Sequence, residues 1–170
     1  TLFTASSNGR RLTNCRHKKL NKYDRPFKYA LKDGQVIAGV SSRHSNRHED
    51  RVFWIRVCKL TQDSRVSAAS TANRNVYSCN KNKKDKPQYC LCRPGERLSV
   101  FKSKHYNKEE DRVWSLKCAA GSAKYTAQDP IGWYTQQPAN AFDKEQKWDG
   151  RATNSFLVGM KSIHDNKKED

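Results

Sequence analysis

The chain has 170 residues, which suits one domain or at most two very small ones. Apolar residues make up only 35% and the mean hydropathy is −1.04, so the core is thin for the length and something besides burial must help to hold the fold. No apolar run approaches the roughly 20 residues that span a bilayer, and the formal charge of +17 favours a polyanionic partner such as sulfated glycan, anionic lipid or nucleic acid.

Residues 1–30 are predicted to form a partly ordered, basic N-terminal segment. They begin with a stretch rich in Ser, Asn and Gly and continue into a cluster of Lys and Arg. Cys15 lies within this cluster, which indicates that a disulfide tethers it. No signal peptide is recognisable, so a secreted form would already have lost it. The candidate polyanion-binding residues of this segment are Arg10, Arg11, Arg16, Lys18, Lys19 and Lys22.

The rest of the chain is organised around a motif, S-x-H-x-N-x-x-E-D, that occurs three times. It begins at Ser42, Ser103 and Ser162, and its five shared positions indicate an internal repeat. Arg51 and Arg112 follow the final Asp of the first two copies. The other shared residues are His44, Asn46, Glu49 and Asp50 in the first copy, His105, Asn107, Glu110 and Asp111 in the second, and His164, Asn166, Glu169 and Asp170 in the third.

Each repeat is predicted to be a β-hairpin with this motif at its tip. Apolar residues precede the motif at matching positions, and apolar and polar residues alternate after it, as in a half-buried strand. The pattern predicts strand, seven-residue polar loop, strand, and imperfect alternation in the first strand hints at a β-bulge. The repeats cover about 27–58, 88–118 and 150–170. The third stops before its second strand, so either the sequence is cut short, which we favour, or this hairpin takes its strand from elsewhere.

The six cysteines are predicted to form disulfides. There is no Cys-x-x-Cys pair and no zinc-finger spacing, which favours disulfides in an oxidising compartment over metal. Cys92 and Cys118 bracket the second hairpin and can bridge its ends, whereas Leu31 and Val57 occupy the same positions in the first. Cys58 is one residue further along, so it faces the other side of its strand. Three pairings remain possible among Cys15, Cys58, Cys79 and Cys90; we prefer Cys15 with Cys58 and Cys79 with Cys90.

Two long connections separate the repeats. Residues 59–87 are rich in Ser, Thr, Asn and Lys, and one short strand is predicted around Val76 and Tyr77. Residues 119–150 carry several aromatic residues, among them Trp133 and Trp148, which we expect to pack beneath the hairpins. The first connection holds a second basic cluster of candidate polyanion-binding residues, Lys81, Lys83, Lys84 and Lys86.

The repeated motif has a scaffolding interpretation and a ligand-binding one. Arg112 and Trp114 lie two residues apart on a strand, so the guanidinium can lie over the ring, and the Asp before Arg112 can accept backbone N–H groups of its loop. Alternatively, His44, Asn46 and Glu49 with their counterparts converge on a metal or a sugar in each repeat. We favour the scaffold, and expect no cofactor and no metal.

The pattern around the motif resembles the dermatopontin family. The resemblance rests on D-R-x-[FW], preceded by a G-x-x-[IL] strand and followed by a strand that ends in Cys, and on Phe27-Lys28-Tyr29 before Gly34. The framed segments 34–58, 95–118 and 154–170 make up about two fifths of the chain. The chain departs from the family at Leu31 and Val57, where the bridge of the first repeat is missing, and it lacks a Tyr-rich acidic N-terminus.

The resemblance implies a secreted, disulfide-bonded matrix protein without enzymatic activity, associated with proteoglycans and cell surfaces. Invertebrate members include haemagglutinins and a cytotoxin of stinging cnidarians. The extracellular location that we expect therefore includes venom or the nematocyst. We therefore expect an adhesion protein that binds sulfated glycosaminoglycan or another cell-surface glycan. The alternative is a membrane-active cytotoxin or haemagglutinin that meets anionic membrane through its basic face and inserts Trp133 and Trp148. A specific nucleic-acid partner is disfavoured because it does not explain the disulfides.

Three similar hairpins separated by similar connections predict an all-β fold. We expect one domain over residues 1–170 with pseudo-threefold symmetry, similar to a β-trefoil, with long loops and disulfides. A twisted sandwich is the alternative. There is no Gly-x-Ser-x-Gly, P-loop or His-Glu-x-x-His motif, and active sites are seldom built in three copies on one small domain, so we do not expect an enzyme.

Overall fold

The computed structural model describes residues 1–7, 10–61, 77–79, 83–84, 86–93, 95–109, 111–120, 135–137 and 144–163. These segments form strands joined by turns, without a helix among them, which confirms the all-β class. No apolar helix of membrane-spanning length occurs in the described segments. The strands are β1 (Leu2–Ser6), β2 (Leu12–Lys19), β3 (Phe27–Ala30), β4 (Gln35–Ser45), β5 (Asp50–Leu60), β6 (Tyr77–Ser78), β7 (Gln88–Leu91), β8 (Glu96–Tyr106), β9 (Asp111–Ala120), β10 (Thr135–Gln137), β11 (Gln146–Asp149) and β12 (Ser155–Ser162).

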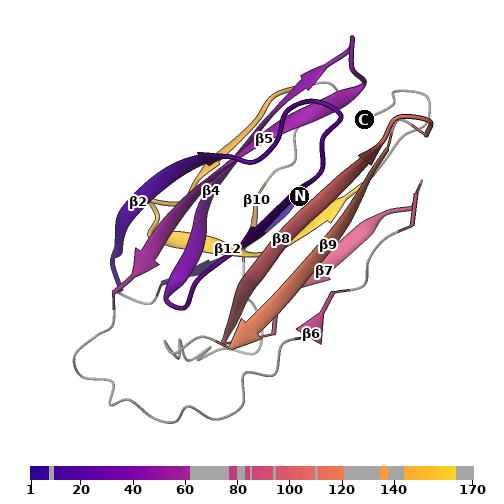
Figure 1. Ribbon diagram of the computed structural model, residues 1–170. Coiled ribbons are helices and arrows are strands. Elements are labelled where there is room, and N and C mark those ends of the chain that lie inside the picture. The colour runs from indigo at the N-terminus through magenta and orange to yellow at the C-terminus, as the bar shows by residue number, and fades with distance from the viewer. Residues whose placement is uncertain are drawn as a thin grey trace.

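The strands form three four-stranded antiparallel sheets with one common plan. We call them the first sheet (β11-β4-β5-β2), the second sheet (β3-β8-β9-β6) and the third sheet (β7-β12-β1-β10). In each, a short lead-in strand pairs with the first strand of a repeat that is not its own: β3 leads into β4 but pairs with β8. The first strands β4, β8 and β12 contact one another, with β12 between the two hairpins (Figure 1). The repeats therefore interlock, while a β-trefoil arrangement stays a prediction.

The first two repeats are the predicted hairpins, but their loops are shorter than predicted. The ladder continues to Ser45 opposite Asp50 in one hairpin and to Tyr106 opposite Asp111 in the other, which leaves four residues between the strands instead of seven. The strands extend into the motif because its polar side chains point inward: Asp50, His105 and Asp111 are buried. Both hairpins contain the predicted bulge, at the register shifts after Ile37 and Leu98.

The third repeat takes its second strand from the N-terminal end of the described chain. Strand β1 pairs with β12, with Thr4 opposite Leu157 and Leu2 opposite Met160, and the register shifts at the same place as in the two hairpins. Val57 and Ile55 hold the corresponding positions opposite Ile37 and Val40 in the first hairpin. The structure thus supports the alternative that we did not favour, in which this hairpin finds its partner elsewhere in the chain.

The interior is closed by an aromatic cluster between the two hairpins. Phe27, Phe53, Phe101 and Trp114 are each at most 6% exposed, and the Phe53 and Trp114 rings meet edge to face with centroids 5.1 Å apart. Phe27 contacts the other three rings, so the lead-in strand β3 contributes a ring that packs between the first and second hairpins. Trp148 packs partly buried against this core, as expected of the second connection, whereas Trp133 lies outside the described residues.

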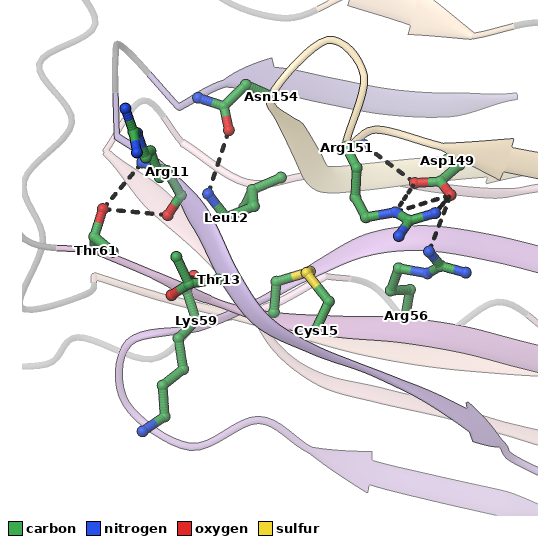
Figure 2. The surroundings of a disulfide bond; sticks show 11 residues. Arg11, Leu12, Thr13, Cys15, Arg56, Lys59, Thr61, Asp149, Arg151 and Asn154 are labelled. Atoms are coloured by element: carbon green, nitrogen blue, oxygen red, sulfur yellow. Dashed lines mark hydrogen bonds and ion pairs between the residues drawn. A yellow bond between two sulfur atoms is a disulfide. The ribbon is translucent and has the colours of Figure 1, made fainter.

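All six cysteines are paired, as Cys15–Cys58, Cys79–Cys90 and Cys92–Cys118. These are the preferred pairings of the sequence analysis. Cys15–Cys58 ties the basic strand β2 to β5 (Figure 2). Cys79–Cys90 joins the residue after β6 to β7, and Cys92–Cys118 joins the residue after β7 to β9. The disulfides therefore join strands within and between sheets, which supplies the extra stabilisation that a thin core requires.

Candidate functional site

The Asp and Arg of the repeated motif form an ion pair that joins two repeats. Arg112 of the second hairpin donates from Nε to Asp50 Oδ1 at 2.5 Å and from Nη2 to Asp50 Oδ2 at 2.7 Å. Their side chains are 8% and 0% exposed. The Arg112 guanidinium also lies 5.5 Å from the centroid of the Phe53 ring of the first hairpin. Arg112 and Asp50 therefore both reach across to another repeat, while stacking of the Arg on the ring of its own strand and capping of the local loop by the Asp stay predictions.

Arg51 repeats part of this arrangement one sheet away. Arg51 Nη1 donates to Ser42 Oγ at 3.2 Å and to the Lys144 carbonyl at 2.9 Å. Arg112 makes the equivalent bonds, to Ser103 Oγ at 3.5 Å and to the carbonyl of Arg25 at 3.4 Å. The acceptor carbonyls precede the lead-in strands β11 and β3. Arg51 therefore fastens β11 to the first sheet, and Arg112 fastens β3 to the second sheet.

Asp24 completes the network, and the sequence analysis did not single it out. Its backbone N–H donates to Asp50 Oδ2 at 2.7 Å, and its carboxylate lies 3.4 Å from Nδ1 of both His105 and His48. The signal was present in the sequence: Asp24, Asp85 and Asp143 each stand three residues before the start of a lead-in strand.

In the two hairpin tips that the structure describes, the His and Asn of the motif lie in different surroundings. His44 and His105 have side chains only 2% and 1% exposed, whereas Asn46 and Asn107 are exposed at the turns, so His and Asn point to different environments. Asp24, Asp50 and His105 bring ligand atoms within 4.8 Å of one another, which would suit a metal ion by distance. Both Asp50 oxygens already accept from Arg112, so a cation there would have to displace a buried guanidinium. Glu110, His164, Asn166, Glu169 and Asp170 lie outside the described residues.

The predicted basic cluster of the N-terminal segment is exposed, with one exception. Arg10 is 7% exposed, because its segment folds back on Ser7, whose Oγ donates to the Arg10 carbonyl at 2.6 Å, while Asn154 Nδ2 donates to the same carbonyl. Arg10 is therefore corrected to a buried residue. The exposed members of the cluster are Arg11, Arg16, Lys18, Lys19 and Lys22, on and beside the edge strand β2.

The second predicted cluster is placed only in part. Lys83 and Lys86 are exposed, and Lys81 lies outside the described residues. Lys84 is engaged by the tip of the second hairpin, with Nζ 2.6 Å from Glu109 Oε1 and 4.4 Å from the centroid of the Tyr106 ring. The hydrogen bond from Lys84 lowers the pKa of the Glu109 carboxyl.

Three arginines on and beside the outer face of the first sheet are paired with carboxylates. Arg56 Nη1 lies 3.2 Å from Asp149 Oδ2, and Arg151 Nη2 donates to the same oxygen at 2.8 Å, as Figure 2 shows beside Cys15. The hydrogen bond from Arg151 is the main reason that the pKa of Asp149 lies below its ordinary value. Arg43 Nε lies 2.9 Å from Glu145 Oε1. Arg43, Arg56 and Arg151 are therefore matched by carboxylates, whereas the exposed Lys19 and Lys147 of the same sheet make no ion pair within the described segments.

The outer face of the second sheet gathers four exposed lysines that the sequence analysis missed. We call the set the lysine face; it consists of Lys28, Lys102, Lys104 and Lys117. They come from β3, β8 and β9 and are far apart in the sequence, so they form no basic run. The alternation of Lys102 and Lys104 on one strand was the only local signal. Only the pairing of the strands brings the four together.

Comparison with known proteins gives a consistent result. The sequence model of the family described as Dermatopontin matches residues 4–62 and 64–170. Millepora cytotoxin-1 of Millepora dichotoma is 32% identical over 158 residues, which cover 89% of this chain and 62% of that protein. The Hemagglutinin/amebocyte aggregation factor of Limulus polyphemus is 32% identical over 150 residues, 85% of this chain and 76% of that protein. Dermatopontin of Biomphalaria glabrata is 28% identical over 97 residues, 57% of this chain and 61% of that protein.

The chain spans less than two thirds of the Millepora and Biomphalaria proteins. No solved structure is significantly similar to it.

Proposed function

Because the chain belongs to the dermatopontin family, we propose that it is a non-enzymatic extracellular adhesion protein that binds sulfated glycosaminoglycan or another polyanionic glycan through its basic surface. The observation that carries the proposal is the division of polar groups between the interior and the surface. The His, Asp and Arg of the motif are buried between the repeats, while basic side chains on β2 and around the second hairpin face solvent. The exposed basic side chains are therefore the groups that we expect to contact an anionic partner.

Three features support an extracellular, non-catalytic role. All six cysteines are consumed in disulfides, which persist in oxidising compartments. The motif carboxylate of Asp50 is buried, and both of its oxygens accept hydrogen bonds within the fold, from Arg112 and from the backbone N–H of Asp24. The net charge of +17 attracts sulfated or carboxylated polymers over several ångströms in low salt.

The second candidate is a membrane-active cytotoxin or haemagglutinin, with a venom or nematocyst location. Two observations favour it as the runner-up. The names of the Millepora and Limulus relatives include a cytotoxin and a hemagglutinin. Tyr89 in β7 and Ile163 just after β12, 56% and 57% exposed, lie on and beside the third sheet, where apolar side chains could enter a membrane interface.

Retention on immobilised heparin, followed by release of dye from anionic liposomes in the same preparation, tests the two candidates. Glycan binding predicts retention that weakens steeply as salt rises, because each neutralised anionic group releases a counterion, by analogy with nucleic acids. It also predicts intact liposomes. Passage through the column without retention would refute the glycan proposal, and leakage of dye would favour the cytotoxin.

A further inference from the structure

The lysine face is a contiguous patch set by strand register. Lys28 of β3 lies directly opposite Lys102 of β8, so their side chains share the outer face of the second sheet. Along β8, Lys104 lies two residues after Lys102, and Val100 lies two residues before it. Lys117 of the neighbouring strand β9 is directly opposite Val100. At about 6.8 Å for every two residues and about 4.8 Å between strands, the four lysines lie within roughly 15 Å of one another. All four are exposed.

The equivalent face of the first sheet provides an internal comparison. Arg56 corresponds to Lys117 in the hairpin register, and its partner Asp149 corresponds to Ala30. In the first sheet Arg56 reaches Asp149 at 3.2 Å across Gly39, whereas in the second sheet Val100 stands between Lys117 and Ala30, and Ala30 carries no charge.

The same comparison holds at two further positions of the lysine face. Lys104 corresponds to Arg43, which pairs with Glu145, and the residue equivalent to Glu145 is Pro26. Lys102 corresponds to Ser41. At these positions the second sheet has Lys28, Lys104 and Lys117 in place of Lys147, Arg43 and Arg56, and it has Lys102 in addition. It has no acidic residue at the positions of Asp149 and Glu145.

Within the described part of the chain, none of the four lysines makes an ion pair; Lys104 Nζ lies 4.5 Å from the centroid of the Tyr106 ring. Two like charges directly opposite one another destabilise an antiparallel pair by up to about 1 kcal/mol. A bound polyanion removes this repulsion. The free chain therefore carries a cost at Lys28 and Lys102 that anion binding relieves.

We propose that the lysine face is the main docking site for a linear sulfated glycan, which crosses β3, β8 and β9 and places sulfate or carboxylate groups on Lys28, Lys102, Lys104 and Lys117. The inference rests on the glycan-binding function proposed above and locates its site. Ammonium groups are compact, mobile charges that suit successive anionic groups on a flexible polymer. A membrane is the poorer occupant, because the exposed large apolar side chains of the described segments, Tyr89 in β7 and Ile163 just after β12, are not on the second sheet.

A pair of matched triple variants tests the site. The first changes Lys28, Lys104 and Lys117 to Gln; the second changes their equivalents in the first sheet, Lys147, Arg43 and Arg56, to Gln, so that both lose three positive charges. Affinity for a heparin oligosaccharide is measured by calorimetry at fixed salt, with thermal unfolding as the check on folding. The first variant is expected to bind about tenfold more weakly or worse, and the second within about threefold of the native chain.

A single substitution provides a second test that leaves every lysine in place. Ala30→Asp puts a carboxylate at the position equivalent to Asp149, two residues along β3 from Lys28 and across Val100 from Lys117, and should weaken heparin binding about twofold to fivefold. Ala30 is exposed, so the change does not enter the core.

Equal losses in the two triple variants, or tighter binding by Ala30→Asp, would overturn the docking site while leaving the glycan-binding function intact. A native chain that fails to bind heparin at all would remove the function itself. Preference for single-stranded DNA or for anionic vesicles over heparin, lost in the first triple variant, would assign the face to a different polyanion and overturn the glycan proposal.

Discussion

Replacing Arg112 with Ala should destabilise the fold more than any exposed substitution. The change removes two charge-assisted hydrogen bonds to Asp50, at 2.5 and 2.7 Å, and leaves a carboxylate that is 0% exposed with the backbone N–H of Asp24. Such bonds contribute about 1.5–3 kcal/mol each, and breaking a buried pair from one side costs about 3–5 kcal/mol. For a domain of this size, about 2–4 °C is lost per kcal/mol. The melting temperature should therefore fall by about 6–20 °C.

The measurement is thermal unfolding followed by circular dichroism with the disulfides intact. Arg151→Ala is the matched control, because Arg151 also makes a bidentate contact with a carboxylate, Asp149, but its side chain is 52% exposed. The control should lower the melting temperature by no more than about 4 °C. A double-mutant cycle with Asp50→Ala should return a strong coupling between Asp50 and Arg112. Equal losses in Arg112→Ala and Arg151→Ala would refute the role of the motif as the joint between repeats.

Three further predictions concern stability. Removing the Cys92–Cys118 bridge by a double change to Ser should cost about 3.5 kcal/mol in the chain-entropy estimate for its separation of 26 residues, and an unchanged urea midpoint would contradict this. Phe27→Ala should cost about 3–5 kcal/mol and reduce the near-ultraviolet circular dichroism, since this ring contacts three others; a loss below about 1 kcal/mol would contradict the central place of the cluster. The pKa of the Asp149 carboxyl is lower in the folded chain than in the unfolded chain. The ionised carboxylate therefore contributes its full stabilisation above the ordinary carboxyl pKa of about 4, and this stabilisation is lost as the pH falls through the pKa of the folded chain. Asp149→Asn should therefore lose less stability than the native chain between about pH 4 and pH 2, and parallel curves of unfolding free energy against pH would count against this ion pair.

Much of the local structure could be predicted from the repeated motif. Matching positions in the repeats identified the hairpins and the bulge, because residues that share one sequence frame meet similar neighbours within a hairpin. The loop length was overestimated because polar residues such as His105 and Asp111 were expected at the surface. Sequence polarity predicts exposure to solvent only on average. A charged side chain such as Asp50 can be buried when a partner such as Arg112 neutralises it.

The contacts between repeats could not be predicted in the same way. Asp50 and Arg112 are 62 residues apart, and a repeat pattern says which positions are alike but not which of them touch. The lysine face depends on β3 pairing with β8 and not with its own hairpin, an arrangement that no local signal reveals. Strand β1 carries only a short apolar stretch and none of the motif, so its place beside β12 follows from the open edge of the third repeat.

The central claim is that surface charge, not the buried motif, is what this chain presents to a partner. The most direct test is a calorimetric titration of a heparin oligosaccharide into the chain that carries Lys28, Lys104 and Lys117 changed to Gln, beside one that carries His105→Ala, at low and at physiological salt. Binding through the lysine face predicts weak affinity with a shallow salt dependence for the lysine variant, and near-native affinity for the folded fraction of the His105 variant. Loss of binding by the His105 variant, with the lysine variant unchanged, would contradict it.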